Sequence, residues 1–310
     1  MNIVSAFKRK PHVDGQTEIV VTQAPSDPLP FLVESFGTSD MGRLRGSNQD
    51  CFVIAELART LSIQHTNLLQ FRENSSRQRA HVFLVADGVG GNQAGEVASG
   101  LSVKTIEEFL LNTLLRFTNL QASEEQVVLR DLQSALVQAD SRIFEESRKN
   151  PEWRGMATTL TMALAANWRL FVAHAGDSRC YLQSAGKLQQ LTQDDTLVGE
   201  LGRCGVISPA DLARHQFRHV VTNYLGGEEL GVRVELHSLA LHEDDVVLLC
   251  SDGLTEMLPE EKISAILVEE RQPQAACERL IAEANRRGGK DNITLIVAHI
   301  MGPGSERDAS

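Results

Sequence analysis

The sequence predicts an α+β fold in which two largely antiparallel β-sheets pack as a sandwich. Nine apolar segments with the length of strands occur mostly in runs, and the long helical segments come in two consecutive pairs. A parallel sheet requires strands and helices to alternate along the chain, which this order does not provide. An antiparallel arrangement is therefore favoured over a parallel α/β fold.

The predicted strands are short apolar runs rich in branched and aromatic residues and bounded by turn residues. They cover residues 32–37, 51–55, 81–86, 158–165, 170–175, 180–184, 232–239, 246–250 and 293–300. Helices are predicted over residues 94–115 and 124–148, where apolar residues recur every three or four positions. A second pair is predicted over 260–270 and 273–286, with Pro273 at a favourable first-turn position.

Length and composition favour one domain. The 310 residues contain no linker, repeat or low-complexity block between about residue 34 and residue 301, which we expect to be the folded domain. Residues 1–33 contain Pro11, Pro25, Pro28 and Pro30 and show no sustained periodicity, so we expect a flexible N-terminal tail. Residues 302–310 are expected to be a C-terminal tail.

Charge and cysteine content exclude several classes of function. The 41 acidic and 30 basic residues give a net charge of -11, which argues against nucleic acid as a partner because phosphate binding needs a basic surface. The longest apolar runs are far shorter than the roughly 18–20 residues of a membrane span. The five cysteines are scattered without a C-x-x-C pair, and the N-terminal charges follow the short apolar run. We expect a cytoplasmic protein with reduced thiols.

Four aspartates stand where predicted strands end or begin. Asp87 and Asp252 follow buried strands and are each followed by glycine, whereas Asp50 and Asp291 stand just ahead of strands. Any one Asp-Gly is more often a plain turn. Together, in an antiparallel sheet, all four would lie at one sheet edge, and such a cluster of like charges is costly without a cation. Because no His or Cys is positioned with these acids, Mn²⁺ or Mg²⁺ is favoured over zinc, as a binuclear centre.

The glycine-rich segment after Asp87 allows two interpretations. Gly88, Gly90 and Gly91 would let the backbone approach the metals closely, with the Gly88 carbonyl as a ligand. A nucleotide-binding loop is disfavoured because Glu96 stands where the P-loop spacing requires lysine.

Arg45 lies five residues before Asp50 and is a candidate for binding a phosphate in bidentate fashion at the mouth of the metal site. A solvated loop arginine is an equal alternative from spacing alone. Arg43 is the competing candidate for the same role.

Seven ordered motifs resemble those of PP2C-type (PPM) metal-dependent Ser/Thr protein phosphatases, most closely the compact bacterial branch. They are Arg45-x-x-Asn48-Gln49-Asp50, Ala86-Asp87-Gly88-Val89-Gly90-Gly91, Ala157-Thr158-Thr159, Gly176-Asp177-Ser178-Arg179, Leu191-Thr192-x-Asp194-Asp195, Ser251-Asp252-Gly253-Leu254 and Gly289-Lys290-Asp291-Asn292-Ile293-Thr294. The resemblance covers roughly residues 34 to 300. It implies a β-sandwich of two antiparallel sheets flanked by pairs of helices, an α-β-β-α arrangement with the metals in a cleft at one edge.

The resemblance also implies roles for individual residues. Asp87 bridges two metal ions, Gly88 gives its carbonyl oxygen to one of them, and Asp252 and Asp291 hold the other. Asp50 supports the cluster through bound water.

Further implied roles concern the phosphate and the cleft. Arg45 binds the phosphate, Asp177 holds a weaker third ion, and residues 197–223 form a variable flap. A water bridging the two metals attacks phosphorus in line, without a phosphoenzyme. The implied partners are phosphorylated proteins and a cognate Ser/Thr kinase.

Three positions depart from the family pattern. Val89 replaces the histidine that many eukaryotic members use to protonate the leaving group, Gln49 replaces an acid, and Asp195 stands where bacterial relatives frequently have histidine. The sequence therefore identifies no general acid, and a metal-bound water near Asp177 is one candidate.

The residues of the chain disfavour three rival functions. No cysteine is followed six positions later by arginine, which excludes the cysteine-dependent phosphatases. His215 and His219 have helical i, i+4 spacing, but residues 217–221 are predicted to be extended, so metal binding by this pair is disfavoured. The remaining alternative is a catalytically weak regulatory module that binds phosphoproteins. It is disfavoured because all four aspartates and Arg45 are present.

Overall fold

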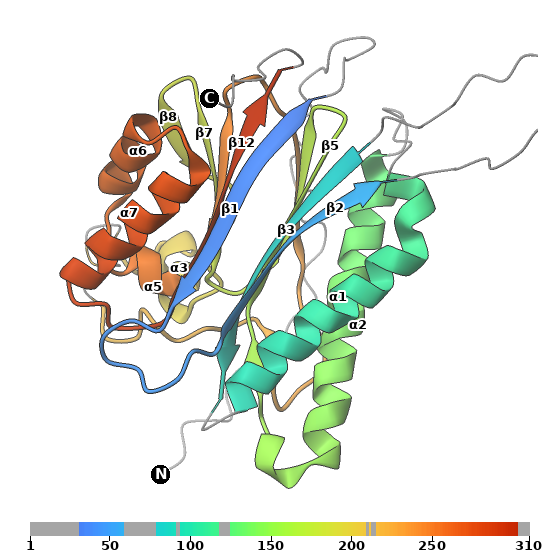
Figure 1. Ribbon diagram of the computed structural model, residues 1–310. Coiled ribbons are helices and arrows are strands. Elements are labelled where there is room, and N and C mark those ends of the chain that lie inside the picture. The colour runs from blue at the N-terminus through green and yellow to red at the C-terminus, as the bar shows by residue number, and fades with distance from the viewer. Residues whose placement is uncertain are drawn as a thin grey trace, which may run out of the picture.

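The computed structural model describes residues 31–58, 79–90, 94–117, 125–208, 211 and 215–302. Most of the predicted N-terminal tail, Gly91 and residues 303–310 of the predicted C-terminal tail lie outside the described residues. The described part forms two β-sheets packed face to face, with helices on both outer faces (Figure 1). None of its helices combines the length and the apolar character that crossing a membrane requires.

All strand pairings within the two sheets are antiparallel. The seven-stranded sheet has the order β10-β6-β5-β3-β4-β9, with β2 also paired to β3. Its strands are β2 (Asp50–Ala58), β3 (Arg79–Val89), β4 (Ala157–Thr158), β5 (Leu160–Ala166), β6 (Arg169–Ala175), β9 (Leu225–Gly226) and β10 (Glu235–Ala240). The five-stranded sheet has the order β1-β12-β11-β7-β8. Its strands are β1 (Leu32–Asp40), β12 (Ile293–Met301), β11 (Val246–Cys250), β7 (Arg179–Ser184) and β8 (Lys187–Gln190).

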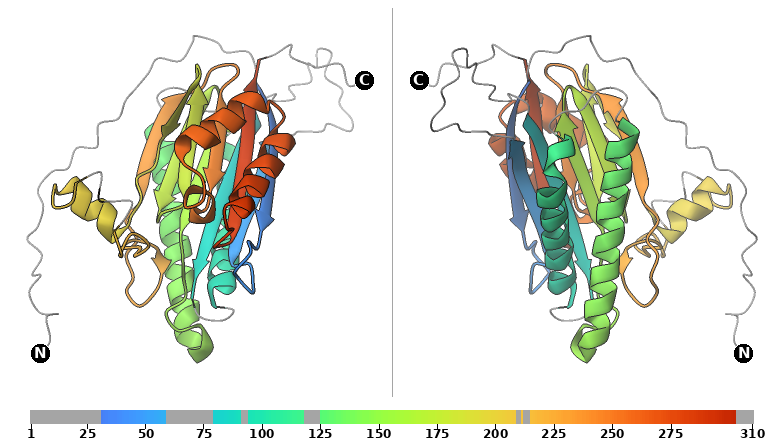
Figure 2. Two further views of the ribbon diagram at one scale, coloured as in Figure 1. Left: turned by 90° about the vertical axis from the view of Figure 1, so that its left-hand side faces the viewer. Right: turned by 90° about the vertical axis from the view of Figure 1, so that its right-hand side faces the viewer.

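The helices cover the sheets in pairs. Helices α1 (Ala94–Phe117) and α2 (Glu125–Lys149) pack on the seven-stranded sheet, and α6 (Glu260–Glu269) and α7 (Pro273–Arg286) pack on the five-stranded sheet. Each view of Figure 2 looks onto one of these pairs. Three shorter helical segments complete the described fold: η2 (Pro151–Trp153), α3 (Leu197–Arg203) and α5 (Asp252–Thr255). The predicted four-layer α-β-β-α sandwich is confirmed.

The central strands are apolar on both faces because both faces are covered. In β3, Phe83 and Val85 pack between the sheets, whereas Val82 and Leu84 pack under α1 and α2. Successive side chains of a strand point to opposite faces, so a strand buried on both sides has a continuous apolar run. Each fully buried Val, Leu or Phe contributes roughly 1.5–3 kcal/mol to this core.

Two predicted strands differ in their extent. The segment 158–165 is divided into β4 and β5 at Thr159, whose N–H donates to the Asp87 carbonyl. The segment predicted from residue 232 becomes a strand only at Glu235. Val232 N–H donates to the Asp140 carboxylate and Arg233 N–H to the Asn223 side chain, so these residues make no ladder bonds there.

One further strand end differs from the prediction, and one strand crosses the predicted start of the domain. Strand β3 continues through Asp87 to Val89, because Gly88 and Val89 pair with β4, so Asp87 does not end its strand. Strand β1 begins at Leu32, so the sheet includes Leu32 and Val33, two residues ahead of the predicted domain start. The short elements β8, β9, η2, α3 and α5 were not predicted, since none has enough residues to show a period.

Candidate metal centre

Two of the predicted carboxylates face each other across neighbouring strands. Asp50 begins β2, and its Cα partner on β3 is Asp87. Residues directly opposite on an antiparallel pair present their side chains on the same face, and like charges there are destabilising. Burial raises the pKa of Asp50 to about 6, although hydrogen bonds from its neighbours oppose the shift. Burial and the charge of Asp50 raise the pKa of Asp87 well above its ordinary value.

The other two carboxylates come from the second sheet. Asp252 is the first residue of α5, directly after β11, and Asp291 lies in the segment just ahead of β12. Burial, followed by the charge of Asp177, raises the pKa of Asp252 well above its ordinary value. The prediction of one sheet edge was therefore wrong. Each sheet contributes two acids, and the four converge at one end of the sandwich.

The cluster contains acceptor atoms without donors. Among the described residues, Oδ1 of Asp50 and Oδ1 of Asp252 are buried and have no hydrogen-bond partner. A buried carboxylate oxygen without a donor is costly, and several such groups with raised pKa values indicate missing positive charge. Carboxylate oxygens in this number suit hard divalent cations, so the residues fit the predicted Mn²⁺ or Mg²⁺ centre.

Gly88 lies too close to a neighbouring helix to carry a side chain. A Cβ atom on Gly88 would lie 2.1 Å from the carbonyl oxygen of Gly95, in the first turn of α1. The Gly88 N–H donates to the Gln49 carbonyl at 3.2 Å. The absence of a side chain thus lets β3 touch both α1 and the residue before Asp50, which fixes the segment that follows Asp87.

Arg45 reaches the acid cluster and Arg43 does not. The Arg45 guanidinium donates to Oδ2 of Asp291 at 2.5 Å, while the Arg45 side chain stays 53% exposed. The pKa of Arg45 is raised, chiefly by that hydrogen bond and further by the charges of Asp87 and Asp252. The described contacts of Arg43 are with Gly289. Of the two arginines, only Arg45 is therefore placed to meet an anion at the cluster.

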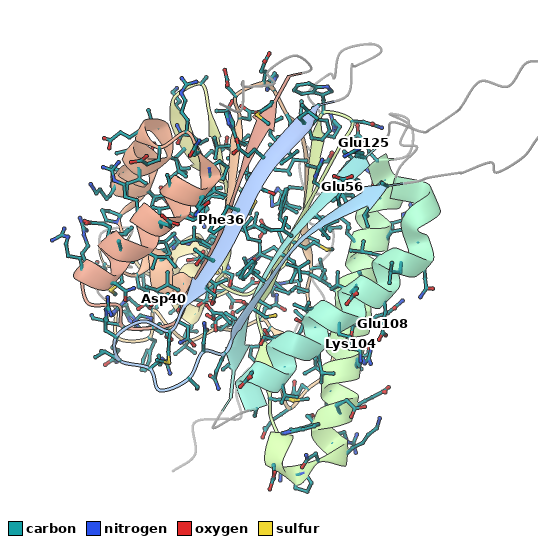
Figure 3. The ribbon with its side chains drawn as sticks, in the orientation of Figure 1. Phe36, Asp40, Glu56, Lys104, Glu108 and Glu125 are labelled. Carbon is teal, nitrogen blue, oxygen red and sulfur yellow. The ribbon has the colours of Figure 1, made fainter. Side chains whose placement is uncertain are left out.

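Asn292 holds the loop that carries Arg45, residues 41–49, against the acid cluster. Its amide nitrogen donates to the carbonyls of Met41 and Ser47, and its amide oxygen accepts from the Gln49 N–H. Asp40, at the end of β1 in Figure 3, accepts from the Gly42 N–H where this loop begins. These hydrogen bonds could not be predicted from local sequence, because they join segments from opposite ends of the chain.

Asp177 lies in a tight turn joined to the same cluster. Its side chain is buried, and burial followed by the charge of Asp194 raises its pKa to about 7. The Thr159 hydroxyl accepts from the Asp87 N–H and is 2.8 Å from the hydroxyl of Ser178, so the turn is connected to the acid on β3.

Asp195, one of the departures from the family pattern, fastens the same turn to the base of the flap. Its carboxylate accepts from the Gly176 N–H, from the Asn223 amide and from Arg233. A carboxylate at this position can accept from three donors at once, whereas a histidine ring nitrogen accepts from one.

A cavity of about 870 Å³ opens beside Asp177 and Asp252. Its other wall is the flap, which includes α3, drawn in yellow and projecting from the sandwich in Figure 2. The flap residues 216–219 form a turn, so the predicted extended segment 217–221 was wrong in this part.

This turn brings a histidine to the acids. Ring and carboxylate atoms of His219, Asp252 and Glu256 lie within 4.8 Å of one another. The expectation that no histidine stands with these acids was therefore also wrong. His215, the other histidine of the flap, is absent from that group and from the cavity wall among the described residues.

A sandwich with a carboxylate cluster at one end, an arginine beside it and an open cavity defines a metal-dependent phosphohydrolase. The comparisons with known proteins narrow this class. Residues 70–284 match the family model described as protein phosphatase 2C. The chain is 33% identical over 272 residues to serine/threonine phosphatase stp of Listeria monocytogenes serotype 4b, a match that covers 88% of this chain and 98% of that protein. The chain therefore belongs to the protein phosphatase 2C family of metal-dependent serine/threonine phosphatases.

Solved structures agree with this assignment. The catalytic domain of serine threonine protein phosphatase PstP in complex with two manganese ions superposes with a TM-score of 0.67 at 30% identity, covering 88% of this chain and 100% of that one. The Mycobacterium tuberculosis phosphatase PstP/Ppp gives a TM-score of 0.69 at 31% identity, covering 87% and 99%. The predicted family, fold and enzyme class are confirmed.

Proposed function

We propose that this phosphatase hydrolyses phosphoserine and phosphothreonine in proteins at the carboxylate cluster, using two Mn²⁺ or Mg²⁺ ions. Asp87 would serve both ions, the Gly88 carbonyl would help to hold one of them, and Asp252 and Asp291 would hold the other. The observation that carries this proposal is the convergence of four aspartates from two sheets, two of which have a buried oxygen without a donor among the described residues. The manganese-bound relative supports the choice of metal.

When bound, the metal ions supply Lewis acidity, which lowers the pKa of water and offsets the charge of the phosphoryl group. The protein residues orient the reaction. Arg45 meets the phosphate oxygens with a planar guanidinium, since its side chain is half-exposed beside Asp291 and is free to turn toward a bound anion. Water attacks phosphorus directly, without a phosphoenzyme.

Two further aspartates support the centre. Asp50 stands opposite Asp87 and accepts from the Ser251 hydroxyl at 2.8 Å, which suits a residue acting through bound water. Asp177 faces the cavity and is connected to Asp87 through Thr159 and Ser178, and we assign it to a weaker third ion.

The wider setting follows from this activity. The substrates are phosphorylated proteins, which require a cognate Ser/Thr kinase, and we place the enzyme in the cytoplasm. The phosphatase domain spans residues 34–301, and the flanking segments 1–33 and 302–310 lie outside it. Leu32 and Val33 are the exception, because they belong to β1 and pair with β12.

The test is hydrolysis of a phosphothreonine peptide with and without Mn²⁺, for the wild type and for Asp252→Asn. Asp244→Asn is the matched control, because Asp244 is exposed in a turn with a positive φ, which asparagine tolerates. We expect metal-dependent turnover that is lost in Asp252→Asn and kept in the control. Metal-independent turnover or an active Asp252→Asn would refute the binuclear site. Phosphopeptide binding without turnover under any divalent ion would support the alternative regulatory module.

A further inference from the structure

We infer that His219 is the general acid of this enzyme, the residue that donates a proton to the serine or threonine oxygen as the phosphate leaves. The inference rests on the proposed function and adds a residue to it. His219, on the flap, lines the same cavity as Asp177 and Asp252. A substrate phosphate bound at the metal centre would place its leaving oxygen in this cavity.

Glu256 positions the histidine ring. It follows Asp252 by one helical turn, and its N–H donates to the Asp252 carbonyl at 2.8 Å. Residues four apart on a helical turn lie on the same face. The Glu256 carboxylate contacts Nδ1 of His219, so the flap histidine is held to the segment that carries a metal ligand. A carboxylate on one ring nitrogen fixes the orientation and the tautomer of an imidazole.

The second ring nitrogen is available for chemistry. Nε2 of His219 has no hydrogen bond to any residue in the described ranges. The His219 side chain lines the cavity and is 43% exposed. A ring held at Nδ1 by a carboxylate and free at Nε2 is the arrangement that general acid–base catalysis uses.

Other side chains of the cavity are poor proton donors. Arginine does not release its proton near neutral pH, which excludes Arg179, Arg203 and Arg218. Asp194 is bound in bidentate fashion by Arg179, at 2.8 and 2.7 Å. Val89, at the position of the eukaryotic histidine, carries no proton to give. Among the described residues lining the cavity and outside the metal carboxylates, His219 therefore has the geometry of a proton donor.

The proposed step balances as follows. The oxygen of a water molecule forms a bond to phosphorus while the bond from phosphorus to the serine or threonine oxygen breaks. The acid form of His219 is the imidazolium with a proton on each ring nitrogen. Its Nε2 proton moves to that departing oxygen, which leaves as a neutral hydroxyl, and the Nδ1 proton stays on the side that contacts Glu256. The proton lost by the attacking water passes to solvent, and the ring regains a proton from solvent. The net reaction converts the phosphate ester and water into the alcohol and inorganic phosphate.

The experiment compares two substrates that differ in their need for an acid. The leaving group of a phosphothreonine peptide is an alkoxide, which departs poorly without a proton. The leaving group of p-nitrophenyl phosphate is a stable phenolate, which needs no proton. With Mn²⁺ present, we expect His219→Asn to lower kcat for the peptide by about 10²–10³-fold and to change kcat for p-nitrophenyl phosphate by less than about threefold. Glu256→Gln should lower the peptide kcat less, with the same dependence on the leaving group. His215→Asn, in the same flap segment, is the matched control and should leave both rates unchanged.

Titration calorimetry on the same variants measures Mn²⁺ affinity. It distinguishes a His219 that donates a proton from a His219 that binds the metal ion. Unchanged affinity together with the substrate-dependent loss supports the inference. Equal losses on both substrates, no loss on the peptide, or a weakened Mn²⁺ affinity in His219→Asn would each overturn it. If the wild type hydrolyses neither substrate with Mn²⁺, the proposed function itself fails, which distinguishes the two outcomes.

Discussion

The hydroxyl of Ser251 donates to Oδ2 of Asp50 at 2.8 Å and thereby joins the two sheets at the metal end of the sandwich. Ser251 follows β11 in the five-stranded sheet and is fully buried, whereas Asp50 begins β2 in the seven-stranded sheet. The same hydroxyl oxygen accepts from the Thr294 N–H at 3.0 Å. One side chain thus fixes both the neighbouring strand β12 and a carboxylate on the facing sheet.

We therefore expect Ser251→Ala to lower the free energy of unfolding by about 1–3 kcal/mol, because Asp50 and the Thr294 N–H would both lose a buried partner. Urea unfolding monitored by circular dichroism measures this change. Ser134→Ala is the control, since Ser134 is exposed on α2 and bonds only within its helix. A loss no larger than that of the control would contradict the cross-sheet role.

The metal-free protein should lose stability as pH rises. The pKa values of Asp50 and Asp177 in the folded chain are raised to about 6 and about 7, above the ordinary 3.8. Between those limits the folded state binds more protons than the unfolded state, so stability falls as pH increases through the folded pKa values. With a chelator present, we expect a loss on the order of 4 kcal/mol between pH 5 and pH 8.

Mn²⁺ should reverse this dependence, because it stabilises the ionised carboxylates. Thermal unfolding across that pH range, with chelator and with Mn²⁺, checks both statements. A metal-free protein that gains stability over the same range would show that the carboxylates are not buried together.

Arg45→Ala should raise KM for a phosphothreonine peptide by about 10-fold or more, since a charge-assisted hydrogen bond to an anion contributes roughly 1.5–3 kcal/mol. Arg43→Ala is the matched control two residues away, since the described contacts of Arg43 are with Gly289. Steady-state kinetics on both variants measure the difference. Equal effects of the two substitutions on KM would show that Arg45 does not bind the phosphate.

Gly88→Ala should destabilise the fold by about 1–3 kcal/mol, because the new methyl group would overlap the Gly95 carbonyl in the first turn of α1. Gly100→Ala, in α1 with nothing near the added atom, should instead stabilise the protein by roughly 0.5–1 kcal/mol. If the close contact between β3 and α1 excludes a side chain at residue 88, thermal unfolding should show stability changes of opposite sign for the two variants. A stable Gly88→Ala would contradict the close approach.

The order of strands was sufficient to predict the acid cluster. Asp50, Asp87, Asp252 and Asp291 adjoin long apolar strands, whose positions are set by local sequence and burial. The sequence could not assign them to two sheets, because an antiparallel pair within one sheet and two pairs in facing sheets give the same pattern of apolar runs.

The flap residues could not be predicted for a different reason. His219 lies in a turn whose position depends on Glu256, in a separate element, and Asp195 depends on Asn223 and Arg233. Such contacts join segments distant in the chain and leave no local period. The only indication in the sequence was the departure of Asp195 from the family pattern.

Dividing the carboxylates between two sheets also affects the order in which the enzyme can mature. Each sheet alone holds two of the four aspartates, and Asp291 comes just ahead of β12, which lies between β1 and β11. During synthesis, a chain released before this strand would hold three of the four aspartates and lack the strand that joins β1 to β11. Phosphatase activity in this protein should therefore appear only after its last strand has been synthesised and inserted.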